Sequence, residues 1–131
     1  MITILVDHNM EGQAILLWGT LAAEGWFDIT PMRLQTLTDV GLPIDSSDRV
    51  VWRYVQAEHM LLLTDNRSMK GPDSLEQTIR EEGTPSSFPV ITIGRLDRID
   101  ERDYRHECAV RLAEIVLDLE FYAGVGRLFI P

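Results

Sequence analysis

Two apolar runs of this sequence each end in an aspartate. Residues 4–9 read ILVDHN and residues 61–66 read LLLTDN, so the runs end at Asp7 and Asp65. Asp and Asn are common at such positions because they form turns and cap the helix that follows. The alternative explanation is that both strand ends point toward one site that needs carboxylates.

Asp48 is the third carboxylate that the pattern brings toward this site. Asp48, Val51, Trp52 and Val55 are spaced by three or four residues, so they share one face of an expected helix. A carboxylate in line with an apolar stripe is expected to point inward over the edge of the sheet. An acid in the first turn is also explained by the helix dipole, a stabilisation of about 0.3–1 kcal/mol. Both explanations of Asp48 are open on the sequence alone.

Three carboxylates at one site require a compensating charge. Two unit charges about 4 Å apart repel by about 4 kcal/mol at an effective dielectric constant near 20. Either the acids keep their protons, or a cation binds between them. Oxygen ligands suit Mg²⁺ or Mn²⁺ better than zinc, and no Cys/His pair has zinc-binding spacing. We therefore expect Asp7, Asp48 and Asp65 to hold Mg²⁺ or Mn²⁺, which would polarise a phosphate group and activate water.

The elements that must position these acids alternate along the chain. Strands are expected at 2–6, 32–37, 60–64, 89–94 and 127–130, and helices at 11–24, 46–59, from Asp73 or Ser74 to near Gly83, and 100–122. This alternation predicts an α/β fold with a mainly parallel sheet covered by helices on both faces. In such sheets, sites form outside the carboxyl ends of the strands. A length of 131 residues predicts a single domain, 1–131.

The charge of the chain restricts how it can bind a polyanion. Twelve Lys and Arg residues against 21 Asp and Glu residues give a net charge of −9, which disfavours nucleic-acid binding by a broad basic surface. A polyanionic substrate then requires metal ions or local cations. Arg67 and Lys70 are nearest in sequence to Asp65, and Arg49 and Arg53 lie on the helix of Asp48.

The expected cellular compartment follows from the single cysteine and from the segments that the sequence lacks. The chain has one cysteine, Cys108, which excludes an intramolecular disulfide and is compatible with a reducing compartment. No apolar stretch approaches the ~18 residues of a membrane span, and no basic-then-apolar signal is seen. We expect a cytoplasmic protein that is not embedded in a membrane.

Taken together, these segments resemble the PIN-like nuclease superfamily, in its short, single-domain, toxin-like branch. The resemblance is carried by ILVDHN, then AAEGW, then LTDVGLPIDSSDRVVWRYVQAEHMLLLTDNRSM, and it spans roughly residues 2–69. It implies a three-layer α/β/α PIN-like fold and an acidic Mg²⁺ or Mn²⁺ site that cleaves RNA. Members of this branch are often the toxin of a toxin–antitoxin pair, and PIN-like proteins are commonly dimers.

The resemblance assigns roles to individual residues. Asp7 matches the acid of the first strand, Asp48 the acid of the helix, and Asp65 the acid of the third strand. Asn9 matches the asparagine that accompanies the first acid. Thr64 matches a hydroxyl residue before the third acid, which it would orient.

The sequence also departs from the pattern of the family. Many PIN-like nucleases have a fourth acid, whereas here Asp97 lies several residues past the strand expected at 89–94. Asn66, Arg67 and Met69 stand where the branch often has a second Asp followed by an aromatic residue. This departure either weakens the site or shifts one ligand role to Asn66.

The sequence thus predicts a metal-dependent endoribonuclease acting on single-stranded RNA, with an antitoxin protein as a further partner and a homodimer as the assembly. The alternative is a PIN-like binding or regulatory module with weak catalysis, which the acidic charge and the missing fourth acid favour. A phosphoacceptor receiver domain also has acids at strand ends. It needs a paired acid after the first strand and a lysine ending a late strand, whereas ILVDHN has one Asp and PVITIG is followed by Arg95.

Overall fold

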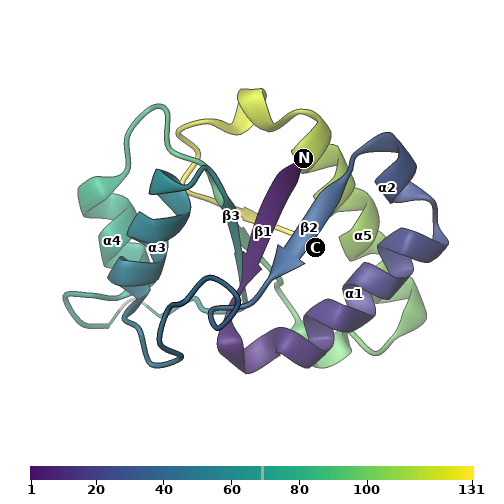
Figure 1. Cartoon of the computed structure of the whole chain (residues 1–131), viewed down its shortest axis with the longest axis horizontal. Coiled ribbons are helices and arrows are strands. Elements are labelled where there is room, and N and C mark those ends of the chain that lie inside the picture. Colours follow the sequence, from purple (N-terminus) through teal and green to yellow (C-terminus); the bar gives the residue numbers. More distant parts are fainter. Residues whose placement is uncertain (69) are drawn as a thin grey trace.

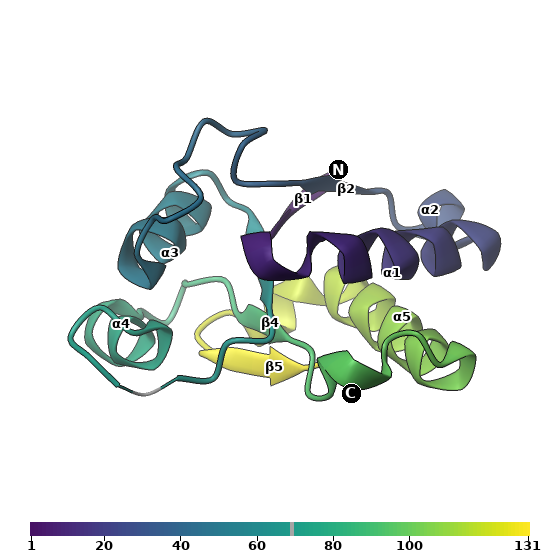
Figure 2. The same ribbon diagram turned by 90° about the horizontal axis from the view of Figure 1, so that it is seen from below.

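The computed structural model describes residues 1–68 and 70–131. Met69 lies outside the described residues. The strands are β1 (Ile2–Val6), β2 (Met32–Gln35), β3 (Leu61–Thr64), β4 (Val90–Thr92) and β5 (Arg127–Phe129). All neighbouring strands are parallel, in the order β2-β1-β3-β4-β5; β1, β2 and β3 are labelled in Figure 1, and β4 and β5 in Figure 2. The expected α/β class with a parallel sheet is confirmed.

Helices cover both faces of this sheet (Figures 1 and 2). The α-helices are α1 (Glu11–Ala23), α2 (Trp26–Ile29), α3 (Asp48–Ala57), α4 (Leu75–Glu82) and α5 (Arg102–Leu117), and the short 3-10 helices are η1 (His8–Met10), η2 (Leu96–Arg98) and η3 (Leu119–Tyr122). Helices α1 and α5 pack together in one core, and α3 and α4 contribute to the other. No helix among the described residues is long and apolar enough to cross a membrane.

The adjacent strands β1 and β3 are mostly apolar because each faces both cores. In β1, Ile4 belongs to the core under α1 and α5, whereas Leu5 belongs to the core under α3 and α4. In β3, Leu63 belongs to the core under α1 and α5, and Leu62 belongs to the core under α3 and α4. Side chains alternate along a strand, so a strand covered on both faces reads as a continuous apolar run.

Serine side chains fix the starts of α3 and α4. Ser46 and Ser47 both precede α3 and are residue types that cap helices. Ser47 is the cap, and its hydroxyl accepts a hydrogen bond from the Val50 backbone N–H at 3.2 Å. Ser46 instead donates to the Pro43 carbonyl at 2.6 Å. Ser74 caps α4 by accepting from the Gln77 N–H at 3.2 Å. These caps set the positions at which Asp48 and the first turn of α4 enter the site.

The helical segments differ from the expected ones at three places. The helix expected at 100–122 ends at Leu117, because Asp118 leaves the helical region at φ −111° and ψ 29°, and η3 follows separately. The short helix α2 has no counterpart in the predicted elements. The spacing of Ile15, Trp18 and Ala22 predicts an apolar helix face in the segment 11–24, whereas Ile15 is 66% exposed.

Candidate functional site

The carboxyl ends of β1 and β3 form the centre of the candidate site. Asp7 follows β1 directly, and its backbone N–H donates to the Leu63 carbonyl of β3 at 3.0 Å. Asp65 follows β3 directly. Within the sheet, β2 lies next to β1 on one side and β3 lies next to β1 on the other. The strand order therefore reverses between β1 and β3. Crevices form at such switch points in open parallel sheets. Both strand-end acids therefore lie where a ligand would bind.

The Asp7 carboxylate is held by a buried hydroxyl. Thr64 Oγ1, which is fully buried, donates to Asp7 Oδ2 at 2.7 Å. Burial raises the pKa of Asp7, this hydrogen bond opposes the rise, and the charges of Asp48 and Asp65 add to it. Asp7 precedes η1 but makes no capping hydrogen bond to it. The capping explanation therefore does not account for Asp7, and the three acids are close enough to interact electrostatically.

Asp48 links three segments at this edge. Its Oδ2 accepts hydrogen bonds from the Asn66 side-chain amide at 2.9 Å and from the Leu75 backbone N–H at 3.2 Å. The Leu75 N–H belongs to the first turn of α4, where backbone donors lack partners within the helix. Asp48 therefore faces the acidic edge, as expected, and also holds α3 to the loop after β3 and to α4.

Thr64 and Asn66 order the turn that carries Asp65. Thr64 Oγ1 accepts from the Asn66 backbone N–H at 3.0 Å, and Asn66 Oδ1 accepts from the Ser68 N–H at 2.9 Å. The expected partner of Thr64 was Asp65, whereas its hydroxyl contacts Asp7. Among the described residues, the Asp65 carboxylate accepts no hydrogen bond, and Asn9 is exposed in η1 with no hydrogen bond from its side chain. Asp65 therefore has its oxygens available to a ligand.

Arg127 is a contributor that the sequence did not indicate. From β5, its Nη1 donates to the Asn66 carbonyl at 2.8 Å and to Thr92 Oγ1 at 2.6 Å, and its Nε donates to Glu76 Oε1 at 2.7 Å. Its Nη2 lies 2.5 Å from the same Glu76 oxygen but has no aligned hydrogen bond. Only 10% of the side chain is exposed. This largely buried ion pair therefore fixes the backbone next to Asp65.

Two shallow hollows adjoin the acids. Asp65 and Arg67 line one of about 460 Å³ together with Gln13, Arg95 and Asp97. Asp97, the nearest approach to a fourth acid, is bound to Arg95 at 2.9 and 3.0 Å, and that hydrogen bonding lowers its pKa. A second hollow of about 390 Å³ lies between Asp48 and Lys70. The exposed Arg67 and Lys70 thus flank the acidic edge on separate sides.

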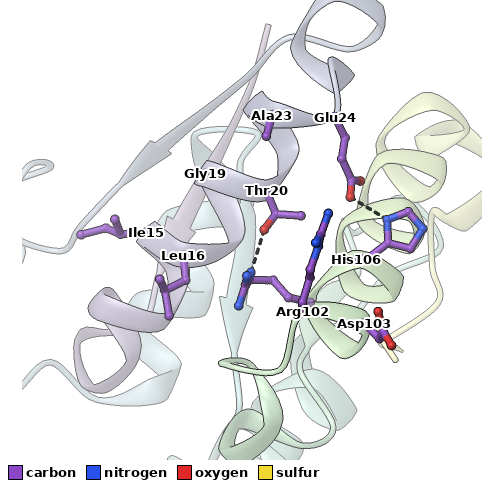
Figure 3. A pocket seen from close by; sticks show the side chains of 10 residues that line it. Ile15, Leu16, Gly19, Thr20, Ala23, Glu24, Arg102, Asp103 and His106 are labelled. Carbon is purple, nitrogen blue, oxygen red and sulfur yellow. Dashed lines mark hydrogen bonds and ion pairs between the residues drawn. The ribbon is translucent and has the colours of Figure 1, made fainter.

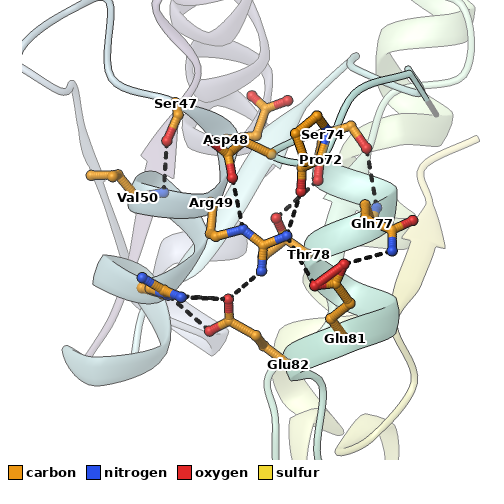
Figure 4. Close-up of polar contacts among 12 residues, drawn as sticks. Ser47, Asp48, Arg49, Val50, Pro72, Ser74, Gln77, Thr78, Glu81 and Glu82 are labelled. Carbon is orange, nitrogen blue, oxygen red and sulfur yellow. Dashed lines mark hydrogen bonds and ion pairs between the residues drawn. The ribbon is translucent and has the colours of Figure 1, made fainter.

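The two arginines of α3 have another role (Figure 4). Arg49 bonds to Asp73 at 3.0 Å, to the Pro72 carbonyl and to Glu82, while Arg53 Nε bonds to Glu82 at 2.8 Å. Hydrogen bonds from Arg53 and Arg49 lower the pKa of Glu82 to about 2. These cations tie α3 to α4, so they are not available for phosphate as the sequence suggested.

The donor set fits a hydrated hard cation better than a closed cage. Among residues 1–68 and 70–131, no group of three or more His, Cys, Asp or Glu side chains is arranged to hold a metal ion. Asp7 and Asp65 nevertheless offer carboxylate oxygens at the centre of the edge. Mg²⁺ commonly keeps several waters and binds through one or two carboxylates. Asp7 and Asp65 supply oxygen ligands of this type, whereas Asp48 is engaged by Asn66 and Leu75.

Comparisons with known proteins assign no function to this chain, so a function has to be inferred from the geometry of the site. No protein-family model matches the chain, and no curated protein or solved structure matches it significantly. Chemically, the edge combines Asp7, whose charge is disfavoured by two neighbouring acids, with flanking cations. Such an arrangement suits a divalent cation and an anionic ligand together.

Proposed function

We propose that this chain is a Mg²⁺- or Mn²⁺-dependent endoribonuclease of the PIN-like type, with its active site at the carboxyl ends of β1 and β3. The observation that carries the proposal is the position of Asp7 and Asp65 at the switch point, with Asp48 near enough to raise the Asp7 pKa. The resemblance of residues 2–69 to PIN-like nucleases supports RNA as the substrate. The same resemblance supports the role of toxin in a toxin–antitoxin pair.

Each residue at the edge has a role in this proposal. Asp7 and Asp65 hold the cation, which when bound polarises a phosphate and lowers the pKa of a water molecule. Thr64 keeps the Asp7 carboxylate in one orientation, and Asn66 does the same for Asp48. Arg67 and Lys70, exposed on either side, bind backbone phosphates of a single strand.

The proposal is tested by incubating the purified chain with a panel of single-stranded RNAs. Cleavage is expected with Mn²⁺ or Mg²⁺, and a chelator should abolish it. Asp65→Ala should lower the rate at least ~100-fold while circular dichroism and the melting temperature stay native. Asp45→Ala is the matched control, since Asp45 is exposed outside the site and should leave cleavage unchanged. Intact RNA with a natively folded protein would exclude the nuclease.

One observation favours a second candidate, a catalytically weak module that binds RNA or a partner. The Asp48 carboxylate is already engaged by Asn66 and Leu75. A site that keeps two acids for a cation and uses the third to hold its own framework would bind without efficient turnover. Metal-dependent RNA binding without cleavage is the result that distinguishes this candidate.

A further inference from the structure

Asn66 lies beside Asp48 in the turn after β3, and its main chain and side chain are both held by hydrogen bonds. Its backbone N–H donates to Thr64 Oγ1 at 3.0 Å, and its carbonyl accepts from Arg127 Nη1 at 2.8 Å. In the side chain, Oδ1 accepts from the Ser68 N–H at 2.9 Å, and Nδ2 donates to Asp48 Oδ2 at 2.9 Å. The amide is therefore fixed in one orientation.

These hydrogen bonds decide which end of the amide faces the acids. A backbone N–H only donates, so the atom of Asn66 that meets Ser68 is the oxygen, and the atom that meets Asp48 is the nitrogen. An amide NH₂ group is a donor, whereas hard cations bind oxygen ligands. In this arrangement Asn66 offers Asp48 a hydrogen-bond donor rather than offering a cation a ligand.

The three acids of the edge differ in how their charge is compensated. Asp48 Oδ2 accepts from Asn66 and also from the Leu75 N–H at 3.2 Å, in the first turn of α4, where the helix dipole is positive. Asp7 has the Thr64 hydroxyl as a donor, yet burial and the charges of two neighbouring acids raise its pKa. Among the described residues, the Asp65 carboxylate accepts no hydrogen bond. The need for a cation is therefore greatest at Asp7 and Asp65.

We propose that the Asn66 amide takes the place of a second cation at this edge, so that the chain binds one Mg²⁺ or Mn²⁺ ion, held by Asp7 and Asp65. The inference rests on the proposed function, because it takes these two acids as the cation site. It adds the number of ions and the residue that limits this number. A carboxylate in place of the amide would face Asp48 with a like charge, which a second ion would compensate.

The hollow of about 810 Å³ between α1 and α5 is the other place where acids and an imidazole gather (Figure 3). Glu24 Oε2 bonds to His106 Nδ1 at 2.6 Å, and Glu24 Oε1 accepts from Trp26 Nε1 at 3.1 Å. Both oxygens of Glu24 are therefore engaged. Arg102 and Asp103 line the same hollow with opposite charges. We therefore expect no second ion there, and Glu24→Gln is a control for binding away from the edge.

The test counts the Mn²⁺ ions bound to the full chain, by titration calorimetry and by equilibrium dialysis. The unaltered chain should bind one ion, and Asn66→Asp should bind two. The electron paramagnetic resonance spectrum is a second readout, because two Mn²⁺ ions held by adjoining carboxylates broaden each other's signal. Asn9→Asp is the matched control: Asn9 is exposed in η1, and the same chemical change there should leave one ion, as should Glu24→Gln.

Adding Asp48→Asn to the Asn66→Asp chain separates a new ion site from a general gain in negative charge. The double variant keeps one carboxylate at these two positions, so it should bind one ion again. In a chelator, Asn66→Asp alone should melt at a lower temperature than the unaltered chain, and Mn²⁺ should restore it. The double variant should be free of this defect, because it lacks the repulsion between the two carboxylates.

The outcomes distinguish this inference from the proposed function. Two ions on the unaltered chain would overturn the inference and leave the nuclease standing, and so would a single ion on Asn66→Asp. One ion on the unaltered chain and two on Asn66→Asp, with RNA left intact, would support the inference and exclude the nuclease. A chain that binds no Mn²⁺ at millimolar concentration overturns both.

Discussion

At the scale of single residues, the site depends on how each carboxylate is partnered. Asp7 is partly buried against a hydroxyl and near two further acids, and its pKa is raised above the ordinary value of 3.8. Asp48 is held by an amide and a backbone N–H, and Asp65 faces the hollow with its oxygens available. Burial and repulsion by the neighbouring acids thus disfavour the ionised form of Asp7 when no cation is bound.

Asp7→Asn should stabilise the metal-free protein and weaken its binding of Mn²⁺. A raised folded-state pKa means that the native state binds the proton more tightly than the unfolded chain. The stability that Asp7 contributes is therefore full below pH 3.8 and is lost as the pH rises through the folded pKa. Urea unfolding at several pH values should find the variant more stable at pH 7, with calorimetry giving at least ~10-fold weaker Mn²⁺ binding. Asp45→Asn, the control, should change neither; equal Mn²⁺ affinity in both variants would exclude Asp7 as a ligand.

Thr64→Val should destabilise the protein, because it removes a fully buried hydroxyl that donates to Asp7 and accepts from the Asn66 N–H. Leaving buried polar groups without partners costs about 1–3 kcal/mol. Thr64→Ser keeps the hydroxyl and should retain most of the affinity for Mn²⁺ and of the RNA cleavage that Thr64→Val loses. Urea unfolding and calorimetry on both variants measure the difference. Equal losses in the two variants would indicate that the methyl group matters rather than the hydrogen bonds.

At the scale of elements, the ion pairs between α3 and α4 hold the helix that carries Asp48. Glu82→Gln should lower the stability at neutral pH, because it removes the acceptor shared by Arg49 and Arg53. The pKa of Glu82 is lowered from 4.5 to about 2, so its contribution is present above pH 4.5 and disappears as the pH falls through about 2. The unfolding midpoints of the variant and the unaltered chain should therefore converge in acid. Glu58→Gln, an exposed change at the end of α3, should leave the midpoint unchanged across that range.

The helices and strands also show which features of the fold could be predicted from the sequence. The apolar runs of β1 and β3 and the serine caps of α3 and α4 are local patterns, and the structure confirms them. The proximity of Asp7 to Asp65 was predictable because parallel strands end at one edge. Arg127 was not, because its contacts with Asn66 and Glu76 depend on packing between segments 61 and 51 residues apart. Ile15 was assigned to an apolar stripe because periodicity cannot tell a face covered within the chain from an exposed one.

At the scale of the whole molecule, the net charge of −9 makes local cations decisive for any polyanion. With Arg49 and Arg53 engaged by acids, the exposed Arg67 and Lys70 are the cations that our proposal assigns to phosphate contacts beside the acidic edge. Replacing both by Gln should reduce the slope of log affinity against log salt by roughly 1–2 units, since ~0.7 counterions are released per single-strand phosphate. Arg80→Gln, an exposed change on α4, should leave the slope unaltered. Filter binding in a chelator measures both, and an unchanged slope in the double variant would remove this loop from the RNA interface.

Arg127 has a consequence for the order in which the candidate site assembles during synthesis. The three acids and Thr64 leave the ribosome well before β5, yet the backbone beside Asp65 is clamped by an arginine translated 61 positions after Asn66. A nascent chain that already carries every acid still lacks this clamp. We therefore expect the candidate site to be complete only after β5 has paired with β4. If the chain is the proposed nuclease, its incomplete site would be inactive until then. A chain ending at Gly126 should accordingly show no Mn²⁺-dependent stabilisation, whereas Arg127→Lys in the full chain should recover part of it.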